Sequence, residues 1–177
     1  EGPDEDDHFR YAKFIADHRA LPIQTFEQGG GEAGHQGWQP PLYYSLVAVI
    51  IAPIDTSDYE QLLWRNNQAT FVGDPACCGR NLYYHTDVEN FPFTRTTLAV
   101  HLARLLSIFF GAVAVYTTYK LARTVAPEQE WLALAAASVV AFNPSFLFAS
   151  ALASNDAPLA AWSAFVLWMW ANWLTEK

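Results

Sequence analysis

Apolar positions are unevenly distributed along the chain, and the longest apolar runs all lie in its second half. Two of them, 131–155 and 157–175, contain no charged residue. Each run approaches the roughly 20 residues that a helix needs to cross the hydrocarbon core of a bilayer. A helical hairpin buried in a large soluble core is the alternative. The pattern favours three transmembrane helices, at about 97–123, 130–153 and 157–175.

The first half contains two shorter helical patterns. In "PDEDDHFRYAKFIADH", Asp4 is a good N-cap, the next acidic residues complement the helix dipole, and apolar side chains recur at helical spacing. The run "PPLYYSLVAVII" begins with two prolines and is too short for a span. We expect both helices, about 4–19 and 40–52, to lie at the membrane interface.

These patterns predict an all-α integral membrane protein with two parts. Residues 1–96 would form an extracytoplasmic loop with two amphipathic juxtamembrane helices, and 97–177 would form three transmembrane helices. Lys120 and Arg123 lie at one end of the first span, which favours a cytoplasmic position for that end. In this orientation residues 1–96 and the turn containing Asp156 share the opposite membrane face.

Charge is distributed as unevenly as hydropathy. Residues 1–96 carry 14 of the 18 acidic residues but 6 of the 10 Lys and Arg residues, whereas 97–177 is balanced. The acidic first part argues against nucleic acid as a partner, because phosphate binding needs clustered Lys and Arg.

The chain ends and the cysteines suggest two further properties. The sequence has no initiator Met and stops directly after an apolar run, so we expect an internal fragment of a longer membrane protein. Cys77 and Cys78 are adjacent. They form either a strained vicinal disulfide or two loop thiols, and the second interpretation is favoured.

Several segments together resemble a known enzyme family. "PDEDDHFRYAKFIADHRALP" followed by "HQGWQPPLYYSLVA" is similar to the first extracytoplasmic loop of GT-C superfamily glycosyltransferases. The nearest resemblance is to protein-mannosyltransferase-like members of glycosyltransferase family 39. "TLAVHLARLLSIFFGAVAVYTTYKLAR" and "FNPSFLFASALASNDAPLAAW" resemble that family's next spans, so the resemblance covers essentially the whole chain.

The resemblance implies a membrane enzyme, expected in the bacterial inner (plasma) membrane, that moves a sugar from a polyprenyl-phosphate carrier to an acceptor hydroxyl. The acceptor is left open. The family's catalytic aspartate falls on Asp4 with Glu5 beside it, and a second acidic residue falls on Asp156. Several relatives carry a lysine before the double proline that meets the lipid phosphate. This chain has Gln39 there, so another cation must take that role.

The reaction mainly needs a general base, because the polyprenyl phosphate is a good leaving group and the neutral acceptor hydroxyl is a poor nucleophile. A carboxylate within hydrogen-bond reach typically contributes about 10²–10⁴-fold to the rate. Asp4 is the candidate, and we expect neighbouring like charges and the nearby membrane to make it more basic. The alternative is that Asp4 only caps its helix. Asp156 is equally open to a catalytic or a capping role ahead of Pro158.

The departing phosphate needs positive charge or oriented donors. His101 and Arg104 lie about one helical turn apart and project from one face. Ionisable residues at such depth are usually functional or paired, and snorkelling to the interface is the alternative for Arg104. The other candidates for substrate binding are His8, Arg10, His35, Gln39 and Tyr44.

No cofactor is expected, although "DEDDH" could hold a divalent metal ion through its carboxylate oxygens. A second class of function also fits the sequence. It is a non-catalytic membrane protein or transporter segment whose acidic loop binds cations or a partner. Inverted repeats of these segments elsewhere in the protein would favour it.

Overall fold

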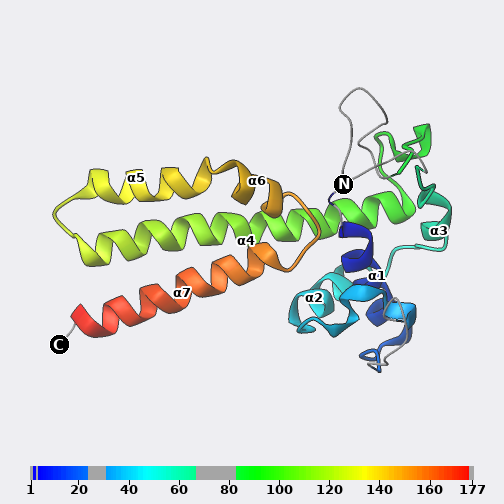
Figure 1. Cartoon of the computed structure of the whole chain (residues 1–177), viewed down its shortest axis with the longest axis horizontal. Coiled ribbons are helices and arrows are strands. Elements are labelled where there is room, and N and C mark those ends of the chain that lie inside the picture. The colour runs from blue at the N-terminus through cyan, green and yellow to red at the C-terminus, as the bar shows by residue number, and fades with distance from the viewer. Residues whose placement is uncertain (1, 3, 24–30, 67–82, 176–177) are drawn as a thin grey trace. The chain divides into compact units, whose positions relative to one another are not determined.

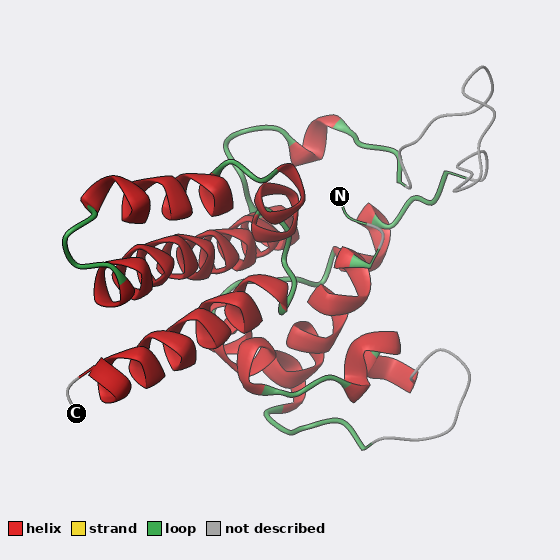
Figure 2. Ribbon diagram, turned by 60° about the vertical axis from the view of Figure 1, so that its left-hand side comes forward, coloured by secondary structure: helices red, strands yellow, loops and turns green. Residues whose placement is uncertain are grey.

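The computed structural model describes residues 2, 4–23, 31–66 and 83–175. All regular elements of this part of the chain are helices, and a single isolated β-bridge joins Arg65 to Tyr83 (Figure 2). The predicted all-α class is therefore confirmed. Cys77 and Cys78 lie outside the described residues, so their state stays a prediction.

The chain divides into two compact units, Glu1–Leu102 and Ala103–Lys177, and the division falls within one long helix. The first unit contains α1 (Glu5–His18), α2 (Leu42–Ile51), α3 (Tyr59–Leu62), the first residues of α4 (Arg95–Val125), and three 3-10 helices, η1 (Gly31–Ala33), η2 (His35–Trp38) and η3 (Asp87–Glu89). The second contains the rest of α4 with α5 (Glu130–Ala141), α6 (Pro144–Ser150) and α7 (Asp156–Thr175).

The core of the first unit forms where α1 packs on α2. Phe9 and Ala12 lie on one face of α1, as their helical spacing predicts, and both are buried. Arg19 ends α1 in the left-handed conformation, with its N–H donating to the carbonyl of Ile15 at 2.9 Å. Three residues of α2, all at most 1% exposed, complete this core: Tyr44, Val47 and Ile51.

A buried carboxylate fixes the start of α4. Oδ1 of Asp58 accepts hydrogen bonds from the Thr96 hydroxyl and from the Thr96 backbone N–H, the latter at 3.3 Å. Arg95, at φ 50°, donates to Asp55 at 2.8 Å and to Ser57 at 2.7 Å. Hydrogen bonds from Ser57 and Arg95 lower the pKa of the Asp55 carboxyl. Since the first N–H groups of a helix lack partners within it, Asp58 acts as a cap supplied from a distant segment.

The helices of the second unit lie along α4. Figure 1 shows α5 and α6 on one side of α4 and α7 on another. The Thr124 hydroxyl of α4 donates to Asn172 of α7 at 3.1 Å, and the Lys120 ammonium lies 5.6 Å from the centre of the Trp168 ring. α4 has 31 residues, which gives a length of about 46 Å and exceeds the roughly 30 Å hydrocarbon core.

The predicted continuous helix at 130–153 was wrong. It is divided into α5 and α6, whose axes differ by 63°. Pro144 has no N–H and disfavours a helical conformation for the residue before it. Asn143 accordingly takes an extended conformation (ψ 120°), and its side-chain oxygen accepts the Phe146 N–H at 3.1 Å. Asn143 is thus the N-cap of a new helix, with proline in its first turn.

By length and composition, α4 is the one helix of the described residues that could cross a membrane by itself. The bent pair of α5 and α6 passes the same test when taken together, as a broken span or a re-entrant loop. α7 has 20 residues, but four tryptophans and Asn172 lower its hydropathy. The prediction of three spans is therefore supported in part.

Asp58→Ala is expected to lower the free energy of unfolding by about 1–3 kcal/mol, because Thr96 then loses a charged hydrogen-bond acceptor. Unfolding of the purified protein in detergent measures the change. Asp87→Ala removes an exposed carboxylate of η3 and serves as the matched control. Equal losses for the two variants would contradict a capping role for Asp58.

Candidate functional site

Asp4 lies immediately before α1 with its side chain exposed. Its backbone carbonyl accepts the His8 N–H at 3.1 Å, but its carboxylate makes no capping hydrogen bond. Asp4 therefore occupies the predicted N-cap position, but its side chain does not cap the helix. The structure leaves this carboxylate at the solvent-exposed start of the helix.

The acidic residues that follow Asp4 have separate environments. Glu5 is only 4% exposed. Asp6 accepts a hydrogen bond from the Tyr83 hydroxyl at its carboxylate, and one from the Tyr59 hydroxyl at its backbone carbonyl at 2.8 Å. Burial raises the pKa of Tyr59, which keeps this hydroxyl protonated as a donor. Within the part of the chain that the structure describes, no three His, Cys, Asp or Glu side chains are grouped so as to hold a metal ion.

An aromatic cluster joins α1 to α2 beside these carboxylates. Nδ1 of His8 lies 2.7 Å from the Tyr44 hydroxyl oxygen, and the two rings are stacked with centroids 5.8 Å apart. The Tyr11 ring lies 4.3 Å from that of Tyr44, and its hydroxyl donates to the backbone carbonyl of Gln39 at 3.4 Å. Burial raises the pKa of Tyr11. The fold thus brings together three of the predicted residues: His8, Gln39 and Tyr44.

Arg10 and His35 do not join this cluster. The Arg10 guanidinium carbon lies 5.5 Å from the centre of the Tyr59 ring, and Nη1 lies 3.6 Å from Glu60 of α3. Its side chain borders a separate polar cavity of about 230 Å³, which Lys13 also lines. His35 is exposed at the start of η2.

The two predicted cationic residues of α4 lie about one helical turn apart, as their spacing requires. Nδ1 of His101 lies 2.8 Å from the carbonyl oxygen of Thr97 and therefore donates to it. The imidazole stacks on Phe93 with centroids 3.7 Å apart. Arg104, which is partly exposed, belongs to the second unit.

Asp156 is the first residue of α7 and is exposed. Its N–H donates to Oγ of Ser154 at 3.4 Å, and its carboxylate lies 3.3 Å from the same hydroxyl. The Ser154 hydroxyl therefore provides the contact with the first N–H of α7. The Ser154 backbone carbonyl accepts from Ser107 of α4 at 3.4 Å, so the turn before α7 is bound to α4.

Sequence reasoning missed three tyrosines of the site: Tyr11, which contacts Tyr44 and Gln39, and Tyr59 and Tyr83, which bind Asp6. Tyr11 lies three residues after His8 on α1, so helical spacing could have identified it. Tyr59 and Tyr83 lie 53 and 77 residues from Asp6 along the chain, and no local pattern indicates these contacts.

A family model, described as dolichyl-phosphate-mannose-protein mannosyltransferase, matches residues 81–177. The match includes α4 to α7, whereas α1 and α2 precede it. Comparison with curated proteins and with solved structures gave no match. Because the matched residues make up more than half of the sequence, the chain belongs to the dolichyl-phosphate-mannose-protein mannosyltransferase family.

Proposed function

We propose that this protein takes part in transferring a sugar, mannose in the first instance, from a polyprenyl phosphate to an acceptor hydroxyl. The family match over 81–177 carries the proposal, since the family's name states a mannosyl transfer from dolichyl phosphate mannose. The length and apolar composition of α4 support a membrane enzyme. The family match also favours this function over a non-catalytic transporter segment.

The proposed arrangement has three membrane crossings: α4, the bent α5–α6 pair and α7. Two crossings then lie between Arg95 and Asp156 along the chain, so these two helix starts would lie at the same membrane face. Lys120 and Arg123 mark the cytoplasmic face.

α2 suits a position at the membrane surface in this arrangement. Its sequence carries no charge, and it is too short to span a bilayer. Leu42, Leu46 and Val49 follow helical spacing and are 62%, 40% and 76% exposed. The opposite face packs on α1. We therefore assign the exposed stripe to lipid, which would hold α1 and its acidic start at the interface.

Asp4 is assigned the role of general base. It would take the proton of the acceptor hydroxyl, whose oxygen then attacks the anomeric carbon of the donor. The bond from that carbon to the phosphate oxygen breaks, and its electron pair leaves with the phosphate. The exposed carboxylate of Asp4, which no capping bond occupies, supports this role. Asp156 is the second carboxylate of the proposed site, and Arg104 is the cation assigned to the phosphate.

Asp4→Asn is expected to reduce transfer by about 10²–10⁴-fold, because the amide cannot accept the acceptor's proton. Full-length protein in membranes is incubated with radiolabelled dolichyl phosphate mannose, and labelled product is counted. Asp17→Asn, an exposed position at the other end of α1, is the control. Full turnover by a folded Asp4→Asn protein would rule out Asp4 as the base.

Tyr44→Phe tests the support of the proposed base, because the contact between His8 and Tyr44 holds α1 on α2. The variant should lower the free energy of unfolding by about 1 kcal/mol, since one buried hydrogen bond is lost. Thermal or denaturant unfolding in detergent measures it. Tyr84→Phe, at a 43% exposed tyrosine, should have no comparable effect. An unchanged stability of Tyr44→Phe would show that the contact does not hold the two helices together.

A further inference from the structure

A polar cavity lies in the first unit, among α1, η1 and α3. Its volume is about 230 Å³, which is below the roughly 300–1,000 Å³ of sites for drug-sized ligands. By helical spacing, the part of α1 that lines the cavity is on a different side of the helix from Asp4 and His8. The ionisable side chains of the cavity that carry the argument are Arg10, Lys13, Asp17, His18, Glu32 and Glu60.

Charges of both signs line this cavity. The Lys13 ammonium lies 2.6 Å from the Asp17 carboxylate, so these two groups already satisfy each other. Arg10 adds a second positive charge, and Glu32 and Glu60 add two negative charges. Within the described residues, no three of these side chains are arranged to hold a metal ion. An isolated ion of either sign would meet charges of its own sign here, whereas a neutral ligand would not.

Two polar contacts at the cavity are too long to be hydrogen bonds. Nη1 of Arg10 lies 3.6 Å from Oε1 of Glu60, and Nε2 of His18 lies 3.6 Å from Oε1 of Glu32. A hydrogen bond from nitrogen to oxygen is usually about 2.7–3.2 Å long. Nε of Arg10 also makes no hydrogen bond in the part of the chain that the structure describes. The hydrogen-bonding capacity of these side chains is therefore only partly used.

Packing holds the two nitrogen-bearing side chains in place. The Arg10 guanidinium carbon lies 5.5 Å from the centre of the Tyr59 ring, and Cδ of Arg10 would be 3.0 Å from a Cβ added at Gly34. Nδ1 of His18 donates to a carbonyl of the preceding turn at 3.1 Å. Nε2 of the neutral imidazole is then an acceptor, like the Glu32 carboxylate opposite it. The cavity therefore offers a fixed donor and several acceptors.

We propose that this cavity binds one sugar residue through its hydroxyl groups, and that the residue belongs to an acceptor that already carries a sugar. A hydroxyl both accepts and donates hydrogen bonds. One hydroxyl can accept from Arg10 and donate to Glu60, and another can donate to Glu32 or His18. The inference rests on the proposed function, whose product is such an acceptor. It adds a sugar-binding site on another side of α1 from the proposed base.

Binding of methyl α-mannoside to the full-length protein in detergent tests this site, measured by saturation-transfer difference NMR. The wild type should bind the sugar. Glu32→Ala and Glu60→Ala should each weaken binding several-fold, because each removes an acceptor. Both side chains are 73% exposed, so neither change should affect folding. Asp87→Ala, at an exposed carboxylate of the first unit outside the cavity, is the control.

Two results of this experiment would overturn the proposal. The first is absence of sugar binding by the wild type, or an equal loss of binding in all three variants. The second is a loss of binding in Asp4→Asn together with full binding in Glu32→Ala, because the sugar would then occupy the proposed reaction site.

Charged competitors test whether the ligand is neutral. Inorganic phosphate and the zwitterion glycine should not displace methyl α-mannoside. If an anion bound at Arg10 instead, Glu60→Ala would strengthen phosphate binding, because a nearby negative charge is removed. Displacement of the sugar by phosphate or glycine would therefore overturn the assignment to a neutral sugar.

A threonine peptide that carries one α-mannose tests where the sugar comes from. It should displace methyl α-mannoside, and the same peptide without its sugar should not. Equal displacement by both peptides, or by neither, would overturn the assignment to a glycosylated acceptor. Transfer of mannose from dolichyl phosphate mannose without sugar binding at the cavity would keep the proposed function and refute this inference. Sugar binding without transfer would support the sugar site and refute the proposed activity.

Discussion

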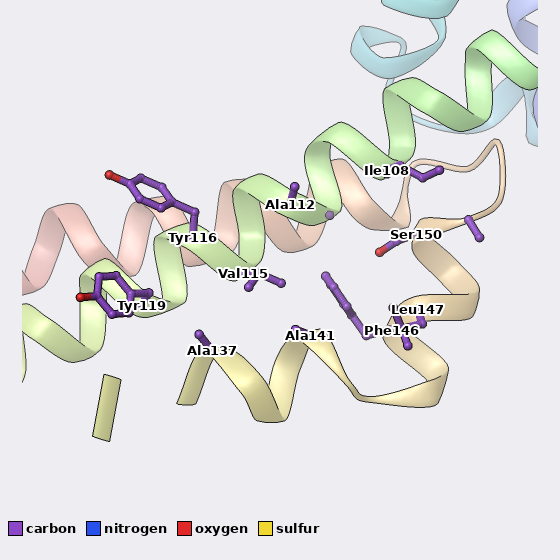
Figure 3. Close-up of a pocket in the computed structure, with 12 residues that line it drawn as sticks. Ile108, Ala112, Val115, Tyr116, Tyr119, Ala137, Ala141, Phe146, Leu147 and Ser150 are labelled. Carbon is purple, nitrogen blue, oxygen red and sulfur yellow. The ribbon is translucent and has the colours of Figure 1, made fainter. Parts of the chain in front are cut away.

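The missing N–H of Pro144 shapes the second unit more than any other single feature. Inside a membrane, each backbone polar group must find a partner within the protein, so a helix can break only where the freed groups are satisfied. Asn143 meets that condition, because its side-chain oxygen accepts a hydrogen bond from the Phe146 N–H. Asn143 is therefore the N-cap of α6. The helices bend by 63° there, and an apolar groove of about 710 Å³, lined in part by Ser150, lies between α4 and the α5–α6 pair (Figure 3).

A different constraint organises the first unit, where several carboxylates start a single helix. The fold gives these carboxylates different surroundings. Glu5 is buried, and the Asp6 carboxylate accepts a hydrogen bond from the Tyr83 hydroxyl. Asp4 remains exposed and makes no capping bond. Of these three carboxylates, Asp4 is the one whose side chain stays exposed.

Local sequence patterns could predict the helices but not the contacts that hold them. Apolar spacing predicted the bounds of α1, α2 and α4 to within a few residues. This was possible because the signal for each helix lies within the helix's own sequence. The helix break at "FNPSF" also has a local signal, the pair Asn143 and Pro144. The long uncharged run around this pair led to the prediction of one helix. In contrast, Asp58 and Thr96 are 38 residues apart in the sequence, and hydrophobic periodicity does not predict a hydrogen bond between such distant residues.

The candidate cations of the first unit have partners within that unit. The first unit is strongly acidic, since residues 1–96 carry 14 acidic residues and 6 Lys and Arg residues. Its own candidate cations have other contacts, because Arg10 faces Tyr59 and Glu60, and His101 stacks on Phe93. Arg104 of the second unit lies on the same face of α4 as Ile108 and Gly111 by helical spacing. A guanidinium has five N–H donors, so Arg104 can bind the phosphate that the proposed function assigns to it while it keeps another contact.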